Sequence, residues 1–222
     1  MCIRDRKSTV PPFELSVFAD PNGAYTTSGA LIAIIERKLR EADGIGLENR
    51  TVKIFGGGPV GLCAAILASD RGAKASLVRL TPNARSDTVS TFTARYDREI
   101  PSESAIDDSE RQGAVSGVDV IICTAKAGIQ VLDKSMLEHA ANLLVAADVN
   151  AVPPAGIEGV GVTDNGTQIE TSWGSFAAIG ALGIGGVKYK VQSQLLRRML
   201  TSEDAVAIDL PEAFDEAVKH VG

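Results

Sequence analysis

The sequence predicts an α/β fold in which a parallel sheet is built from strands that alternate with helices. Short apolar runs at 52–55, 75–80, 118–123 and 143–148 are separated by segments with helical periodicity. This alternation is typical of parallel βαβ units. The runs are almost continuously apolar, as expected for strands that helices cover on both faces of the sheet.

The chain before this pattern predicts a lead-in, one strand and one helix. Residues 1–12 are polar and end in two prolines, and a short strand is expected over 15–19. Turn-forming residues follow at 20–23. A helix is then expected over 29–41. Its cap is expected from one of three hydroxyl residues, Thr26, Thr27 or Ser28.

Further helices are expected between and after the strands of the alternating pattern. Those between strands or within their connections are predicted over 59–69, 84–93, 107–115 and 132–140. Beyond Gly156 the chain is rich in glycine until a helix over 186–200, and an amphipathic helix is expected over 210–221.

Composition narrows the class of protein. The chain has 222 residues, of which 45% are hydrophobic, and a net charge of −6. Such a chain is long enough for one sizeable core or two smaller ones. The negative charge argues against nucleic-acid binding, and no segment approaches the roughly 20 apolar residues of a membrane span. The charged N-terminus is unlike a signal peptide, so a cytoplasmic location is expected.

The cysteines and histidines do not predict a metal site. Three cysteines, Cys2, Cys63 and Cys123, lie far apart without metal-ligand spacing. Two of them sit in apolar runs, which favours buried free thiols. The two histidines also lack a partner at ligand spacing, so no metal is expected.

The pattern Gly56-x-Gly58-x-x-Gly61 carries the first functional prediction. It follows a predicted strand, opens a predicted helix with Pro59 and Val60 in the first turn, and precedes a second strand. This context is that of the Rossmann dinucleotide-binding fingerprint. In that fingerprint the three glycines in turn allow a tight turn, backbone approach to the pyrophosphate, and close packing of helix against strand. The alternative is that the glycines serve only to turn the chain.

The end of the second strand bears on the choice of coenzyme. A carboxylate there would accept a hydrogen bond from the ribose 2′-OH of NAD, but this strand ends in Val78-Arg79-Leu80-Thr81, with Arg85 close behind. An arginine can pair bidentately with the 2′-phosphate of NADP. The sequence therefore favours NADP, with NAD possible, and the alternative is that Arg79 is a solvated strand-end charge.

Three further segments are expected to face the crevice in which the dinucleotide would bind, because parallel strands end at one edge of the sheet. Thr124 follows one strand, Asp148 and Asn150 follow the next, and a glycine-rich stretch leads to Lys188. Each residue also has a simpler structural interpretation, since Asp148 could cap a turn and Lys188 could be a solvated lysine.

Four blocks of sequence, taken together and in order, resemble a known family. They are 20–27, 56–61, 148–154 and 181–188. The family is the NAD(P)-dependent methylenetetrahydromethanopterin dehydrogenases of methylotrophic bacteria, and the likeness extends from about Leu15 to the C-terminus. The glycine fingerprint is generic, whereas the Asp-x-Asn-Gly-x-x-Thr-Thr and Leu-Gly-Ile-Gly-Gly-x-Lys blocks are more specific.

The resemblance implies oxidation of the methylene bridge of a reduced pterin to the methenyl form, with hydride passing to NAD(P)⁺. It implies that Asp20, Asn22, Thr27 and Lys188 position the substrate. On the cofactor side it adds Thr124 to the residues already singled out around the fingerprint and at Arg79. It also implies a homo-oligomer.

The resemblance further implies how the chain is divided. Residues 1–46 would be the lead-in and the remnant of an N-terminal pterin-side domain, residues 47–185 a Rossmann-type NAD(P)-binding domain, and residues 186–222 helices that pack back towards the first domain. The family has a longer N-terminal segment than is present before Leu15. Two other functions remain as alternatives: a methylenetetrahydrofolate dehydrogenase and a non-catalytic NAD(P)-sensing module.

Overall fold

The computed structural model describes residues 14–82 and 92–221 of the chain. Its strands are β1 (Val17–Phe18), β2 (Thr51–Phe55), β3 (Lys74–Arg79), β4 (Ser102–Ser104), β5 (Val120–Cys123), β6 (Val145–Asp148), β7 (Asn165–Thr171), β8 (Gly174–Ile179) and β9 (Ala207–Ile208). Its α-helices are α2 (Ala24–Asp43), α3 (Pro59–Asp70), α5 (Asp108–Ala114), α6 (Lys134–Leu137), α7 (Ala181–Thr201) and α8 (Leu210–His220), with short 3-10 helices η1 (Pro21–Gly23) and η2 (Ala94–Tyr96).

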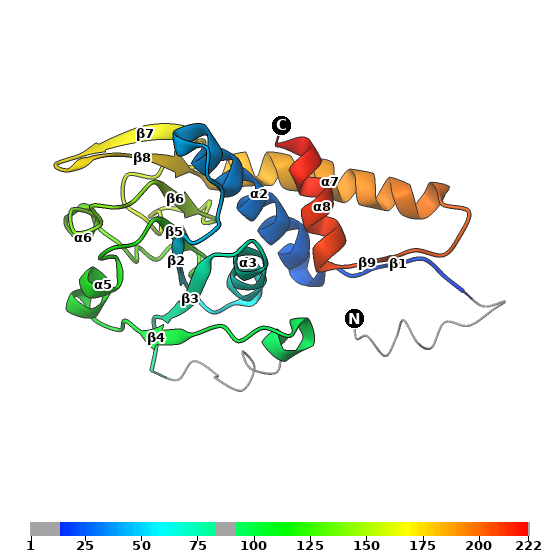
Figure 1. Ribbon diagram of the computed structural model, residues 1–222, viewed down its shortest axis with the longest axis horizontal. Coiled ribbons are helices and arrows are strands. Elements are labelled where there is room, and N and C mark those ends of the chain that lie inside the picture. The colour runs from blue at the N-terminus through cyan, green and yellow to red at the C-terminus, as the bar shows by residue number, and fades with distance from the viewer. Residues whose placement is uncertain (1–13, 83–91, 222) are drawn as a thin grey trace.

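The main sheet has seven strands in the order β4-β3-β2-β5-β6-β8-β7 (Figure 1). All neighbouring pairs are parallel except β7 with β8, which form an antiparallel hairpin. From β2 the chain passes through α3 to β3 on one side, and it later returns to β5 on the other side of β2. The strand order therefore reverses between β2 and β5, where ligands bind in open sheets of this kind.

Two hydrophobic cores cover the two faces of the sheet. Alternate residues of β2 point to opposite faces, so that Ile54 packs with α2, α3, α7 and α8, while Phe55 packs in the core that includes α6. Figure 1 shows the first group of helices on one side of the sheet and α5 and α6 on the other. Burial on both faces explains the continuous apolar runs of the central strands.

A second, two-stranded sheet joins the two ends of the described chain. β1 pairs in parallel with β9, and Val17 donates its N–H to the carbonyl of Val206 at 2.7 Å. Helix α2, which follows β1, packs against both α7 and α8. The N-terminal strand and helix and the C-terminal helices therefore form one packed group beside the main sheet.

The alternating strands and helices of the sequence are confirmed, and several details differ. α2 begins at Ala24, five residues earlier than predicted, so the prediction that Thr26, Thr27 or Ser28 caps it was wrong. α7 also begins five residues early, at Ala181, and α6 is much shorter than predicted. The predicted helix over 84–93 lies largely outside the described residues.

The strands β4, β7, β8 and β9 were not predicted. β4 and β9 are too short to show a pattern, and the hairpin lies in the stretch interpreted as glycine-rich chain.

None of the helices in residues 14–82 and 92–221 has the length and apolar character to cross a membrane. The same residues contain no group of three or more His, Cys, Asp or Glu side chains that could hold a metal ion.

Candidate functional site

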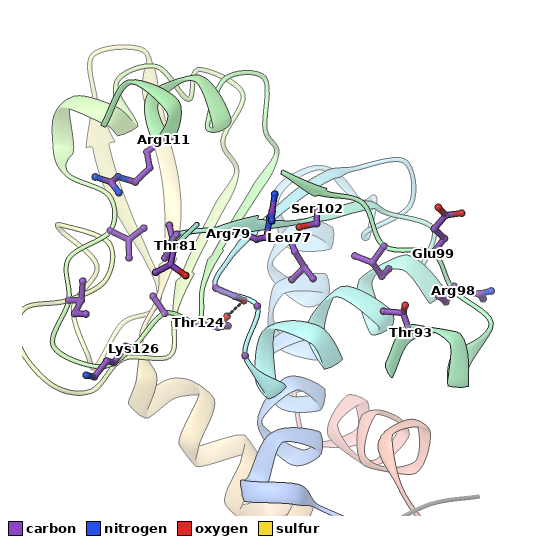
Figure 2. Close-up of a pocket in the computed structure, with 18 of the residues that line it drawn as sticks. Leu77, Arg79, Thr81, Thr93, Arg98, Glu99, Ser102, Arg111, Thr124 and Lys126 are labelled. Carbon is purple, nitrogen blue, oxygen red and sulfur yellow. Dashed lines mark hydrogen bonds between the residues drawn. The ribbon is translucent and has the colours of Figure 1, made fainter. Parts of the chain in front are cut away.

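A cavity of about 1300 Å³ lies at the carboxyl ends of β2, β3 and β5 (Figure 2). Its position is the point where the strand order reverses. The described residues that line it come from the glycine-rich loop, the end of β3, the 93–102 segment, α5 and the loop after β5. They are Gly56, Gly57, Gly58, Leu77, Arg79, Leu80, Thr81, Thr93, Ala94, Arg98, Glu99, Ile100, Ser102, Arg111, Thr124, Ala125, Lys126, Ile129, Gln130 and Val131.

Two glycines of the fingerprint are required by close packing. Gly56 has a φ of +116°, and a Cβ there would lie 2.8 Å from the carbonyl carbon of Thr124. At Gly61 a Cβ would lie 2.1 Å from the carbonyl oxygen of Gly56. Any larger residue at either position would push apart the loop, α3 and β5. These two glycines have the tight-turn and close-packing roles that the fingerprint predicts.

The middle of the loop is open instead. No atom lies within 4 Å of a Cβ built on Gly57 or Gly58. Gly58 is the N-cap of α3 and provides no side-chain cap, and Pro59 follows it. Within the described part of the chain, nothing accepts a hydrogen bond from the N–H of Val60 or Gly61. Free donors at the positive end of a helix dipole make this loop fit a bound pyrophosphate.

Thr124 connects this loop to the next strand. Its backbone N–H donates to the carbonyl of Phe55 at 2.9 Å, and its hydroxyl donates to the carbonyl of Gly56 at 2.8 Å. Figure 2 shows the second bond at the floor of the cavity. Thr124 therefore holds the turn in place and borders the cavity at the same time.

Arg79 is the last residue of β3 and lines the cavity. Its Nε atom is buried and has no hydrogen-bond partner among residues 14–82 and 92–221. A buried cationic donor without a partner is costly, and an anionic acceptor in the cavity would relieve that cost. Arg85, the other cation predicted to face the coenzyme, lies outside the described residues.

The side chains of Asp148 and Asn150 are engaged within their own loop. The carboxylate of Asp148, 2% exposed, accepts from the N–H of Asn150 at 2.9 Å, of Gly156 at 2.6 Å and of Ile157 at 3.2 Å. Burial raises the pKa of this carboxyl, although the three backbone donors oppose the shift. Neither residue lines the cavity, so these side chains are not brought to its wall.

Among the residues expected to position the substrate, Asp20 accepts hydrogen bonds from the first turn of α2. One carboxylate oxygen accepts from the N–H of Tyr25 at 2.9 Å and of Thr26 at 3.2 Å, and the other accepts from the Thr26 hydroxyl at 2.7 Å. Asn22, exposed, has a left-handed φ of 52° in the preceding turn. The hydroxyl of Thr27 donates to the carbonyl of Gly23 at 2.6 Å.

Lys188 lies at the same turn. A Cβ built on Gly23 would lie 2.5 Å from its Nζ, which places the ammonium beside Gly23 in space. Among residues 14–82 and 92–221 Lys188 forms no ion pair, so no aspartate there holds its ammonium. The structure thus brings the four proposed substrate-side residues to the turn at the start of α2, whereas Asp148 accepts hydrogen bonds within its own loop.

The sequence analysis missed the cavity wall formed by 93–102 and by Arg111. Arg98 is paired there with Asp70 at 2.6 Å, and Arg111 donates to the carbonyl of Ile106 at 3.0 Å. No local pattern marks this wall, because it is placed by the pairing of the three-residue strand β4 with the edge of β3. The loop after Thr124, by contrast, follows a clear strand and could be predicted.

The reversed strand order, the glycine turn and the cavity at the carboxyl ends define a Rossmann-type α/β protein. Solved structures share this fold at low sequence identity. A dipicolinate synthase from Bacillus halodurans is similar with a TM-score of 0.54 and 17% identity, over 83% of this chain and 57% of that one. An L-alanine dehydrogenase is similar with a TM-score of 0.50 and 15% identity, over 99% of this chain and 73% of that one.

Sequence comparison identifies the family. No family model matches the chain. The NAD(P)-dependent methylenetetrahydromethanopterin dehydrogenase of Methylorubrum extorquens is 36% identical over 100% of this chain and 75% of its own length. The bifunctional protein MdtA of the same organism is 29% identical over 90% of this chain and 67% of its own length. The chain belongs to the NAD(P)-dependent methylenetetrahydromethanopterin dehydrogenase family, whose members are oxidoreductases.

Proposed function

We propose that the chain oxidises methylenetetrahydromethanopterin to its methenyl form by hydride transfer to NAD(P)⁺, in one-carbon metabolism. The observation that carries the proposal is the open glycine loop on a large cavity in a chain of this family, with N–H groups of Val60 and Gly61 that have no acceptor among residues 14–82 and 92–221. The same loop and cavity fit a nicotinamide dinucleotide, which when bound supplies the hydride acceptor.

The chemistry of this substrate suits a site without an evident acid or base. The hydride leaves a carbon held between two nitrogens, so the product cation is a delocalised amidinium. No proton moves in that step, and the tasks left to the protein are alignment, exclusion of water and electrostatic stabilisation. Side chains that fix orientation are therefore expected to matter more than side chains that titrate.

The cofactor side of the proposal rests on the loop and its neighbours. Gly56, Gly58, Pro59, Val60 and Gly61 would cradle the pyrophosphate, with Thr124 holding the turn. Asp148 and Asn150 would affect coenzyme binding indirectly, because their side chains hold the conformation of the loop over 150–157.

The substrate side rests on the cluster at the start of α2. Asp20, Asn22, Thr27 and Lys188 would position the reduced pterin. The ammonium of Lys188, which forms no ion pair with the described residues, is the best donor of the four for a carbonyl or carboxylate of the substrate. Because Asp20 accepts three hydrogen bonds from the first turn of α2, its contribution to substrate binding would come mainly through the shape of this turn.

The preferred coenzyme is proposed to be NADP. The Nε of Arg79 is buried on the cavity wall without a partner among residues 14–82 and 92–221, which supports this choice, because a 2′-phosphate offers the acceptor that this Nε lacks. The position of Arg79 at the end of β3 is also that of the carboxylate that selects NAD in many Rossmann proteins.

We also propose that the chain is divided into the regions 1–46, 47–185 and 186–222. We propose further that the protein is cytoplasmic and that it forms a homo-oligomer. Support for the oligomer comes from α7, which exposes large apolar side chains on a single stripe opposite its packed face: Leu182, Tyr189, Leu196 and Leu200. Light scattering coupled to size-exclusion chromatography tests this part of the proposal, and a monomeric mass would contradict it.

A direct assay tests the activity. The purified chain is mixed with NADP⁺ or NAD⁺ and with methylenetetrahydromethanopterin or methylenetetrahydrofolate, and the absorbance of the reduced nicotinamide is followed. The expected result is turnover that is fastest with NADP⁺ and the methanopterin. Faster turnover with the folate would favour the alternative substrate, and tight coenzyme binding without any turnover would favour a sensor.

A further inference from the structure

The turn before α2 contains two consecutive left-handed residues, Asn22 with a φ of 52° and Gly23 with a φ of 69°. A glycine is favoured in this conformation on backbone grounds alone. At Gly23 there is a second reason, because a Cβ would lie 2.5 Å from the Nζ and 3.2 Å from the Cε of Lys188. The end of the Lys188 side chain occupies the space that any other residue at 23 would fill.

This placement of Lys188 is not explained by electrostatic attraction. The N-terminus of a helix is the positive end of its dipole, so a cation there is disfavoured. The carboxylate proposed for the same site, Asp20, accepts from Tyr25, Thr26 and, at 3.4 Å, from the side chain of Gln192. In the described chain Lys188 has no ion-pair partner, and it is half-buried. Packing rather than charge therefore sets its position.

We propose that Gly23 is a positioning residue for Lys188: the space that its missing side chain leaves, here called the seat, admits the ammonium to the start of α2. A side chain at 23 would displace the ammonium from this place, and with it the N–H donors offered to the substrate. This inference rests on the proposed function only in that Lys188 contacts the pterin. The seat itself is a property of the protein without any ligand.

Gly44 provides a matched control. It caps the other end of the same helix with a φ of 80°, and no atom lies within 4 Å of a Cβ built there. Gly23→Ala and Gly44→Ala therefore impose the same backbone strain on α2, of about 1 kcal/mol, and only the first meets Lys188. Gly23→Asn is a second variant, since asparagine tolerates positive φ better than alanine.

The seat is tested without substrate. The full chain and its variants are labelled with trace acetic anhydride, and the acetylation of Lys188 relative to Lys190 is measured by mass spectrometry. Gly23→Ala and Gly23→Asn should change the relative labelling of Lys188 several-fold, while Gly44→Ala leaves it at the wild-type value. If both Gly23 variants label as wild type does, the seat is contradicted.

The consequence for the reaction is tested by steady-state kinetics. Loss of a charge-assisted hydrogen bond corresponds to about a tenfold or larger rise in KM for the pterin in Lys188→Ala. Gly23→Ala should raise KM in the wild-type background and cause no further rise in the Lys188→Ala background, with coenzyme affinity unchanged. Additive effects of the two substitutions would overturn the inference. Shifted labelling with a normal KM in Lys188→Ala would leave the seat standing and remove Lys188 from the proposed substrate site.

Discussion

The N-termini of α2 and α3 both begin after a glycine cap, but their backbone donors have different partners. Each helix has a glycine at its N-cap, and neither cap residue provides a side-chain hydrogen bond. At α2 the N–H groups of Tyr25 and Thr26 donate to the carboxylate of Asp20. At α3 the corresponding donors of Val60 and Gly61 have no acceptor in the described residues, and Gly58 just before them lines the cavity.

The difference shows what makes a helix end available to a ligand. The dipole and the free N–H groups are present in every helix, so they do not by themselves define a site. A protein carboxylate that already accepts from the first turn, as at α2, competes with an external anion. Glycine without a neighbouring carboxylate, as at α3, leaves the donors open for a phosphate group.

The largest expected effect is at the open helix end. Gly58→Val should weaken binding of NADP and of NAD by more than about a hundredfold, because a β-branched side chain would fill the space in which the pyrophosphate approaches the backbone. The backbone of Gly58, at φ −73° and ψ 179°, suits valine, so the fold should persist. Isothermal titration measures the affinity and thermal unfolding checks the fold. Unchanged affinity would show that this loop does not bind the coenzyme.

The second effect concerns Asp148, another carboxylate that accepts backbone donors. Asp148→Ala should lower the free energy of unfolding by about 3 kcal/mol, since it leaves the N–H groups of Asn150, Gly156 and Ile157 without their acceptor. Chemical denaturation measures this loss. A change below about 1 kcal/mol would mean that water replaces the carboxylate and that the loop does not depend on it.

Asp148 also gives the unfolding free energy a defined pH dependence. Burial raises the pKa of this carboxyl above its ordinary value of 3.8, so the folded protein holds the proton more tightly than the unfolded chain does. The part of the unfolding free energy that comes from this pKa shift is therefore fully present below pH 3.8 and is lost as the pH rises through the folded pKa, whereas the three backbone hydrogen bonds to the carboxyl group remain. Asp148→Asn should remove that part of the pH dependence, and an unchanged pH profile would contradict the assignment.

A smaller effect is expected from Arg79, which would act on the coenzyme beside the open helix end. Arg79→Ala should weaken NADP relative to NAD by about 1–3 kcal/mol, because one charge-assisted pair with the 2′-phosphate is lost. Arg50 is a suitable control, since its Nε is also buried without a partner but it does not line the cavity. Arg50→Ala should leave the preference unchanged. Equal weakening of both coenzymes by Arg79→Ala would remove the basis for NADP selection.

The parts of the site that could be predicted from the sequence are those that the backbone alone determines. The spacing of Gly56, Gly58 and Gly61 between a strand and a helix specifies a turn, an open position and a close contact, and the packing at the first and last of these agrees. The parallel pairing of the central strands follows from the alternation of strands and helices. Both are local or nearly local properties of the chain.

The remaining features depend on contacts between distant segments. Whether Asp148 faces the cavity or its own loop is decided by the return of the chain at Gly156, which no local pattern shows. The neighbour of Lys188 is decided by the packing of α7 against α2, and the 93–102 wall by the pairing of β4 at the sheet edge. Polar residues at strand ends thus indicate candidates, and tertiary packing selects among them.

The smallest effect is expected at the closed helix end, and it separates two roles of Asp20. Asp20→Ala should lower the free energy of unfolding by about 1 kcal/mol, as for the loss of a capping side chain, while Thr27→Ala should change it by less than about 0.5 kcal/mol. Asp20→Asn keeps an oxygen that can accept from Tyr25 and Thr26, so most of the stability should remain.

The Asp20→Asn variant therefore tests whether the carboxylate of Asp20 contributes to substrate binding, separately from its role in stability. If Asp20 acts only by holding the first turn of α2, then Asp20→Asn should retain both its melting temperature and its KM for the pterin. If the carboxylate also contacts the substrate, KM should rise while the melting temperature stays near that of the wild type. A large loss of stability in Asp20→Asn would show that the negative charge at the helix dipole, rather than the hydrogen bonds, holds this end of α2. The α2 terminus would then resemble an occupied anion site, with Asp20 in the place that a phosphate would take at α3.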